Sequence, residues 1–187
     1  RSYIGVFPRA TLWVGARTIP WYRLTAQGLR IQASDNIPML RALSRDPLII
    51  KKTRVDAIKG LVDTMDAAMT SAPAIRTRTM ILYGTRDELV PRQPTFDMIA
   101  ALSPGTDHQP AVYRFGWHLL LRDLRARIVL DDIVAWIAEP SAALPSGADK
   151  AARRAMATAI AGSTPKNETD ILTIPIVAGV WPRYGLL

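Results

Sequence analysis

The chain of 187 residues contains no cysteine, which excludes disulfide bonds, iron–sulfur clusters and thiolate zinc sites. A chain without cysteine fits a reducing compartment, so we expect a cytoplasmic location. The chain also has only two histidines and no clustered carboxylates. We therefore expect neither a metal site nor a cofactor. Glycine and proline are near ordinary usage, which excludes a collagen-like or wholly disordered chain.

A long uninterrupted apolar run is also missing. The apolar stretch Tyr3–Trp21 is broken by one proline and two arginines, Pro8, Arg9 and Arg17. It is therefore neither a signal-peptide core nor a membrane span. Its aromatic side chains could still anchor on a membrane surface, although such side chains more often pack in a core. Because the chain begins inside this stretch and without Met, we expect a piece of a longer protein.

The net charge of +8 is uneven along the chain. Residues 1–60 contain eleven Lys or Arg and three Asp or Glu, whereas residues 61–187 contain thirteen of each kind. A basic segment can face nucleic acid, anionic lipid or an acidic partner, or can be a solvated helical surface. No helix-turn-helix, aromatic RNA-binding strand or zinc knuckle accompanies the charge, so we do not expect nucleic-acid binding.

Residues 1–74 show helical patterns and no strand signal. The expected helices cover residues 11–19, ended by Pro20, then a helix to Leu43, one reopening at Asp46-Pro47, and residues 54–69. Ser34, Asp35 and Asn36 offer capping oxygens to the second helix, in which Pro38 is tolerated in the first turn. The last helix carries an apolar face formed by Val55, Ile58, Leu61, Val62 and Met65.

Residues 75–138 change to an alternation of strand and helix, which indicates an α/β fold. The predicted elements are a strand at 79–83, a helix from Pro91 to Leu102, a strand at 111–115 and a helix at 124–137. The last helix has an apolar side of Ile128, Val129, Ile133, Val134 and Ile137. The connection is long enough for a right-handed parallel crossover. Because two parallel strands are not a stable sheet, we expect the edge of a larger one, in a fragment or with an obligate partner.

Residues 139–187 form the third segment, a linker and tail of unknown role. The linker covers residues 140–147, and an Ala-rich helix is expected at 149–161. A polar break then leads to the apolar residues 171–180, which contain Pro175. This last run suits an edge strand, a docking segment or an unstructured extension.

Two residues that can carry chemistry follow the two predicted strands. Asp87 lies in the turn after residues 79–83, and His118 lies just after residues 111–115. The carboxyl ends of parallel strands meet at one sheet edge, so this acid and this histidine are expected near each other. They are two members of a hydrolase triad in the chain order Ser, Asp, His. Taken singly, the aspartate can be a turn former and the histidine a loop residue.

Several stretches resemble one family. Residues 34–41 (SDNIPMLR), 46–48 (DPL) and 53–57 (TRVDA) resemble the cap of bacterial lysophospholipases, the monoacylglycerol-lipase-like or serine aminopeptidase-type α/β-hydrolases. Residues 82–91 (LYGTRDELVP) are similar to the acid turn of that family, and residues 116–123 (GWHLLLRD) to its histidine turn. The resemblance covers residues 1–138 and implies a helical cap at 1–74 and the C-terminal part of the hydrolase core at 75–138.

The resemblance assigns roles to both residues. His118 would be the general base, and Asp87 would orient it. Glu88 is the neighbouring carboxylate, whose side chain should point elsewhere, and His108 should lie in the loop before its strand, at the opposite end of the sheet. The cap would line an acyl channel with candidates Trp13, Trp21, Tyr22, Met39 and Leu40, which can equally be core residues.

The nucleophile of this family is missing from the chain. No Gly-x-Ser-x-Gly elbow occurs in the 187 residues, and no His-Gly oxyanion loop. Ser34 begins a helix, Ser71 lies in a loop before Pro73 and Ser163 lies in the polar tail, so none of them both follows a buried strand and opens a helix. The elbow precedes the cap in this family, so the serine is expected upstream of Arg1.

We therefore expect the C-terminal part of a serine hydrolase for monoacylglycerols or lysophospholipids, inactive alone, whose lipid ester substrate binds once an N-terminal half completes it. The alternative is a non-catalytic module that binds a partner or an anionic membrane surface through its basic helical block.

Overall fold

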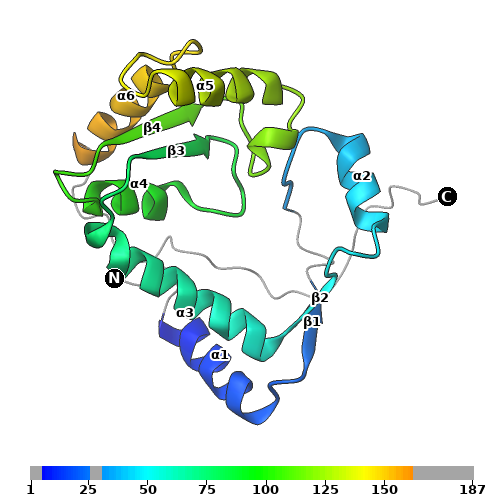
Figure 1. Cartoon of the computed structure of the whole chain (residues 1–187). Helices are drawn as coiled ribbons and strands as arrows, with labels where there is room; N and C mark the ends of the chain where they lie inside the picture. The colour runs from blue at the N-terminus through cyan, green and yellow to red at the C-terminus, as the bar shows by residue number, and fades with distance from the viewer. Residues whose placement is uncertain (1–5, 26–30, 162–187) are drawn as a thin grey trace. The chain divides into compact units, whose positions relative to one another are not determined.

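The computed structural model describes residues 6–25 and 31–161, with the backbone alone at residue 6 and at 159–161. The described residues fall into two compact units. The first contains residues 6–25 and 51–62, and the second contains residues 31–50 and 63–161 (Figure 1). The apolar residues 171–180 and Ser163 lie outside the described residues. None of the helices within the described ranges is long and apolar enough to cross a membrane.

The first unit contains a short antiparallel strand pair that the sequence did not suggest. Its elements are α1 (Val6–Thr18), β1 (Arg23–Thr25), β2 (Lys52–Arg54) and the first part of α3 (Val55–Ser71). Arg23 pairs with Arg54, and the amide of Val55 donates to the carbonyl of Tyr22 at 2.9 Å. The expectation of no strand in residues 1–74 is wrong. Each strand has only three residues, all exposed, so no apolar alternation marks them.

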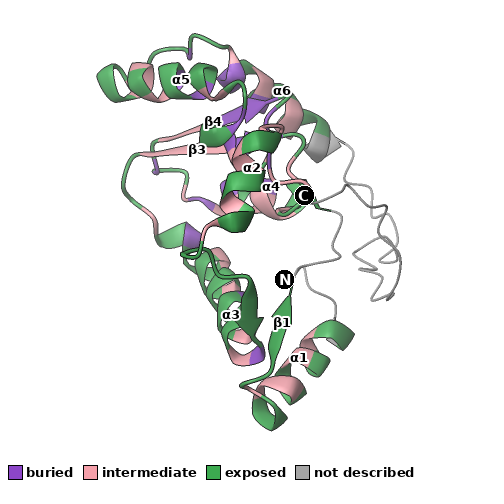
Figure 2. Ribbon diagram, turned by 90° about the vertical axis from the view of Figure 1, so that its right-hand side faces the viewer, coloured by how far each residue is buried: buried purple, intermediate pink, exposed green. Residues whose placement is uncertain are grey.

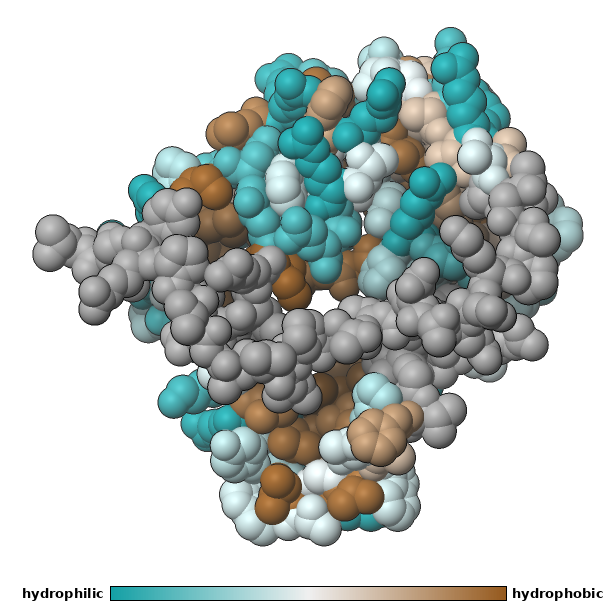
Figure 3. All heavy atoms as spheres, turned by 180° about the vertical axis from the view of Figure 1, so that it is seen from behind, coloured by the Kyte–Doolittle hydropathy of each residue, from teal (hydrophilic) through white to brown (hydrophobic). Residues whose placement is uncertain are grey.

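Much of the apolar surface in this unit is exposed. Figure 3 shows hydrophobic side chains on the surface around α1 and α3. Of the apolar face predicted for α3, only Val55 and Val62 are buried, while Leu61 is 61% exposed. The guanidinium of Arg17 lies 3.7 Å from the ring centroid of Trp13, which is itself half-exposed.

In the second unit, α2 (Ile37–Arg45) begins as the sequence predicts. The side chain of Asn36 caps it by accepting from the amide of Met39 at 3.2 Å, and Pro38 lies in the first turn. The helix expected to reopen at Asp46-Pro47 does not form. Asp46 instead ends α2, and its side chain accepts from the amide of Leu48 at 2.9 Å. That bond holds a turn where a helix was predicted.

A parallel strand pair forms the centre of the second unit. It consists of β3 (Thr79–Gly84) and β4 (His108–Tyr113), whose register runs from Thr79 opposite His108 to Gly84 opposite Tyr113. The predicted parallel pair and the α/β class are confirmed. The bounds of the second strand, expected at 111–115, are wrong, because Pro110 lies within β4. Among the described residues β4 pairs only with β3, and such an edge position tolerates the missing amide of proline.

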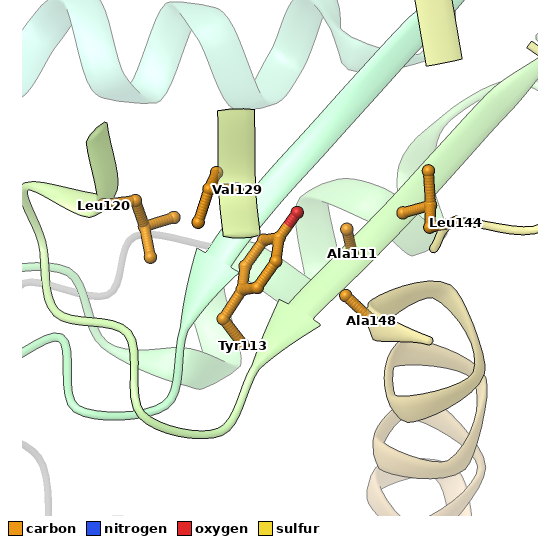
Figure 4. Close-up of a cluster of buried hydrophobic side chains, with 6 residues drawn as sticks. All are labelled: Ala111, Tyr113, Leu120, Val129, Leu144 and Ala148. Carbon is orange, nitrogen blue, oxygen red and sulfur yellow. The ribbon is translucent and has the colours of Figure 1, made fainter. Parts of the chain in front are cut away.

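Helices cover both faces of this strand pair (Figures 1 and 2). They are α4 (Arg92–Ala101), α5 (Ala126–Ala138) and α6 (Ala148–Ala161), with short 3-10 turns η1 (Ala72–Ala74) and η2 (Leu120–Arg122). Successive residues of β4 enter different clusters, because side chains alternate across a strand. Ala111 and Tyr113 pack with Leu120, Val129, Leu144 and Ala148 (Figure 4). Val112 packs on the other side with Tyr83, Phe96, Ile99 and Ala152.

The end helices differ in how well the sequence predicted their packing. The Ala-rich helix expected at 149–161 is present as α6, and its Ala152 is fully buried against the cluster of Val112. The small side chain lets α6 approach the strand closely. In α5 only Val129 of the predicted apolar side is buried, and Ile128, Val134 and Ile137 are exposed.

A buried carboxylate connects β4, α5 and the segment before α6. Asp132 is fully buried and accepts from the hydroxyl of Tyr113 at 3.0 Å, and from the amide of Ser146 at 3.0 Å and its hydroxyl. Burial raises the pKa of Tyr113 well above its ordinary value, and the hydrogen bond to Asp132 adds to that rise. The residues expected to be a linker are thus held against the core at Ser146.

Candidate active site

The two turns that carry the predicted site leave the strand pair at the same end. Gly84 and Tyr113 are opposite each other at the last register position of β3 and β4. The acid turn (residues 85–90) follows β3, and the histidine turn (residues 114–123) follows β4. Parallel pairing therefore brings Asp87 and His118 to one edge, although 31 residues separate them.

Backbone hydrogen bonds join the two turns directly. The amide of Arg86 donates to the carbonyl of Gly116 at 2.9 Å, and the amide of Thr85 donates to the carbonyl of Tyr113 at 3.0 Å. The hydroxyl of Thr85 donates to the carbonyl of Arg114 at 2.6 Å. A Cβ on Gly84 would lie 2.7 Å from the carbonyl oxygen of Trp117 and closer still to the carbonyl of Gly116. Glycine is required there by this close approach.

Asp87 is held by its own turn. One carboxylate oxygen, Oδ1, accepts from the amides of Leu89 at 2.8 Å and Val90 at 2.9 Å. The backbone amide of Asp87 donates to the carbonyl of Gly84 at 3.1 Å. These contacts orient the carboxylate and leave Oδ2 free to accept a further hydrogen bond.

Oδ2 of Asp87 lies 2.9 Å from Nδ1 of His118. The aspartate side chain is 8% exposed and the histidine side chain 35% exposed. An ionised carboxylate only accepts, so this contact assigns the proton of a neutral imidazole to Nδ1. Nε2 is then left with a lone pair, which is the arrangement of a general base held by an orienting acid.

The remaining predicted residues do not join this pair. Glu88 points away, and its Oε2 accepts from the amide of Gln32 at 2.7 Å. His108 is the first residue of β4, opposite Thr79, so its predicted place in a loop is wrong. Its position at the far end of the sheet from His118 is as expected, and its Nδ1 lies 2.8 Å from the carbonyl oxygen of Thr106.

The five predicted channel residues are not buried. Trp13, Trp21 and Tyr22 are exposed in the first unit, and Met39 and Leu40 are half-buried in the second. Their role in lining an acyl channel stays a prediction. In the described part of the chain, no three His, Asp or Glu side chains come together in a group that could hold a metal ion.

Two residues around His118 were missed as partners of the site. Asp123 accepts from the hydroxyl of Ser34 at 2.6 Å and from the amide of Trp117 at 2.8 Å. Ser34 was expected only as a helix cap. Asp123 is the last residue of the histidine-turn motif, and no role was predicted for it. The only available signal was a carboxylate at the end of a motif rich in apolar residues, and its partner is 89 residues away.

Aromatic side chains and a cavity lie near the two turns. Burial raises the pKa of the Tyr83 phenol, and the negative charge of Asp87 raises it further. The guanidinium of Arg86 lies 5.5 Å from the ring centroid of Phe115 and 5.7 Å from that of Trp117. A cavity of about 230 Å³ lies behind the histidine turn, between the end of β4, α5 and the start of α6. Neither Asp87 nor His118 lines it.

Comparisons with known proteins agree with the fold. A family model described as serine aminopeptidase, S33, matches residues 2–125, a range that includes both turns. The crystal structure of the monoacylglycerol lipase of Paleococcus ferrophilus is similar, with a TM-score of 0.62 and 20% sequence identity. The similarity covers 72% of this chain and 52% of the lipase, so the chain spans about half the length of that enzyme. The chain belongs to the serine aminopeptidase S33 family of α/β-hydrolases.

Proposed function

We propose that this chain supplies the base and the acid of a serine hydrolase for carboxylic esters of lipids, and that residues outside these 187 supply the nucleophilic serine. The observation that carries the proposal is the 2.9 Å contact between Nδ1 of His118 and Oδ2 of Asp87. No Gly-x-Ser-x-Gly sequence occurs in the chain. The chain alone is therefore inactive under this proposal.

The roles follow from the arrangement of the two side chains. Nε2 of His118 takes the proton of a serine hydroxyl as the serine oxygen attacks the ester carbonyl, and the imidazolium returns that proton to the leaving alcohol. Water repeats the cycle and releases the carboxylic acid. Asp87 fixes the Nδ1 proton and stabilises the imidazolium. The bonds from Leu89 and Val90 keep the carboxylate oriented meanwhile.

The substrate class rests on the resemblance of residues 34–57 to lysophospholipase caps and on the similarity to a monoacylglycerol lipase. Monoacylglycerols or lysophospholipids are the proposed substrates. The positive charge of residues 1–60 would favour an anionic lipid surface. Hydrolysis by a completed enzyme that does not respond to anionic lipid in the vesicles would contradict this part.

The first test uses the chain as it is. The purified 187-residue chain should hydrolyse neither p-nitrophenyl butyrate nor monoolein and should not react with a fluorophosphonate probe. Turnover that His118→Ala abolishes would overturn the statement that the chain lacks a nucleophile. The coding sequence directly upstream, read in all frames, should contain a strand, a Gly-x-Ser-x-Gly turn and a helix.

The second test completes the enzyme with that upstream segment. Ester hydrolysis should then appear, and His118→Ala or Asp87→Ala should lower kcat by about 10⁴-fold. His108→Ala is the matched control and should retain activity, because His108 lies at the other end of β4. No hydrolysis by a folded, completed enzyme would contradict the proposal.

The alternative is a non-catalytic module that binds a partner or an anionic membrane. It is favoured by the exposed aromatic side chains of the first unit, Phe7, Trp13, Trp21 and Tyr22, next to its basic residues. Absence of an upstream nucleophile segment, together with vesicle binding that the anionic lipid content controls, would support the module over the hydrolase.

A further inference from the structure

We propose that Ser34 and Asp123 are positioning residues that hold His118 toward Asp87. This proposal rests on the proposed function in one respect, since the catalytic use of the held histidine comes from that function. The contacts themselves belong to the described second unit, which contains both turns and residues 31–36. They involve no residue of the first unit.

Asp123 closes the histidine turn on itself. Its Oδ2 accepts from the amide of Trp117, six residues earlier and directly before His118, at 2.8 Å. Asp123 is 7% exposed. A carboxylate in such a place must satisfy both oxygens, and a donor from outside the turn completes it.

Ser34 is that outside donor. Its hydroxyl donates to Oδ1 of Asp123 at 2.6 Å, and its oxygen accepts from the amide of Asn36 at 3.2 Å. Ser34 is fully buried. Its single hydroxyl is thus used as donor and acceptor, which fixes its rotamer and links the segment before α2 to the histidine turn.

The same segment holds the residue after His118. The amide of Leu119 donates to the carbonyl of Ala33, the neighbour of Ser34, at 2.9 Å. His118 therefore stands between two anchored amides, that of Trp117 on Asp123 and that of Leu119 on Ala33. Anchoring on both sides restricts the backbone of His118 and so the direction of its imidazole.

Weaker contacts extend the attachment to both turns. The side-chain amide of Asn36 donates to the carbonyl of Arg122 at 3.1 Å, and Asp35 accepts from the amide of Leu124 at 2.8 Å. At the acid turn, Glu88 accepts from the amide of Gln32. These contacts are exposed, so the buried Ser34–Asp123 bond is the central one.

A carboxylate suits this position better than an amide. Asn at 123 could accept from Trp117 with its oxygen and donate to Ser34 with its nitrogen. The buried hydroxyl proton of Ser34 would then lose its acceptor. Asp123→Asn should therefore give an effect between those of wild type and Asp123→Ala.

The test reads the His118–Asp87 hydrogen bond by NMR in the 187-residue chain. Wild type should show a downfield Nδ1 proton that Asp87→Asn removes. Ser34→Ala and Asp123→Ala should broaden or shift it and accelerate amide exchange at Trp117 and Leu119. The control Thr106→Val also removes a buried hydroxyl bond, to the carbonyl of Ile75 at 2.6 Å, but at the other end of the sheet. It should leave the resonance unchanged.

In the completed enzyme, Ser34→Ala and Asp123→Ala should lower kcat by about 10- to 100-fold with KM little changed. The proposal is overturned if both variants fold and keep the wild-type Nδ1 resonance, whether or not the completed enzyme is active. If Asp123→Ala does not fold, the Nδ1 resonance of Ser34→Ala is the deciding measurement, because that variant removes only one hydroxyl. A completed enzyme without hydrolysis contradicts only the proposed function, because the resonance is measured without substrate.

Discussion

The acid turn and the histidine turn lie at the same edge of the sheet but are held by different kinds of contact. Asp87 accepts from amides two and three residues ahead of it, so its turn is organised locally. The histidine turn depends on Ser34, 89 residues before its partner Asp123. Local contacts need only neighbouring residues to come together, whereas the second kind requires the fold. The acid turn should therefore be more robust than the histidine turn.

The largest expected effect comes from the point where the two turns touch. In Gly84→Ala the new Cβ would meet the backbone of Gly116 and Trp117, which cannot move aside as a side chain can. We expect a loss of about 3 kcal/mol in the free energy of unfolding, measured by urea denaturation. Gly60→Ala is the control, since its Cβ meets nothing within 4 Å, and it should stabilise α3 by about 0.5–1 kcal/mol. A neutral Gly84→Ala would mean that the turns are not in close contact.

Substitutions of Asp87 should have a smaller effect, and they test whether the histidine turn is held independently of the acid turn. Asp87→Ala leaves the amides of Leu89 and Val90 without an acceptor and should cost about 1–2 kcal/mol. Asp87→Asn keeps an oxygen for them and should cost less than about 1 kcal/mol, while its NH2 group faces Nδ1 of His118 and removes the acceptor of the Nδ1 proton. Amide chemical shifts in residues 114–123 should move little in Asp87→Asn. Large shifts there would show that the histidine turn is not held independently of the acid turn.

A further effect, smaller than that of Gly84→Ala, concerns Tyr113, the last residue of β4 before the histidine turn. Tyr113→Phe removes one donor from Asp132, which keeps both bonds from Ser146, so we expect a loss of about 1 kcal/mol. The folded-state pKa of Tyr113 is raised, so its stabilisation is full below about pH 10, the value of an unfolded tyrosine, and is lost as pH rises toward the folded-state value.

The prediction for Tyr113 is checked by measuring the free energy of unfolding as a function of pH. Above about pH 10 the unfolding free energy of wild type should fall more steeply than that of Tyr113→Phe, because only the wild type must release this proton on unfolding. Tyr83 is present in both proteins, so its own raised pKa cancels in the comparison. If the unfolding free energies of the two proteins fell equally with pH, folding would not raise the pKa of Tyr113.

Much of the second unit could be predicted because its signals are local. The apolar run closed by Gly84 predicted β3, and the capping oxygens of residues 34–36 predicted the start of α2. The errors have a physical reason as well. The exposed strands β1 and β2 have no apolar periodicity, and Pro110 concealed the first part of β4, since proline is tolerated on an edge strand.

The residues of the candidate pair, Asp87 and His118, were determined by the sequence, because each follows a recognisable strand and parallel strands end at one edge. Which groups hold them was decided by the tertiary structure. The Ser34–Asp123 bond and the contact of Leu119 with Ala33 join residues far apart in the chain. No periodicity or spacing encodes such a pairing, since a single buried hydroxyl finds its acceptor only when the fold brings the two together.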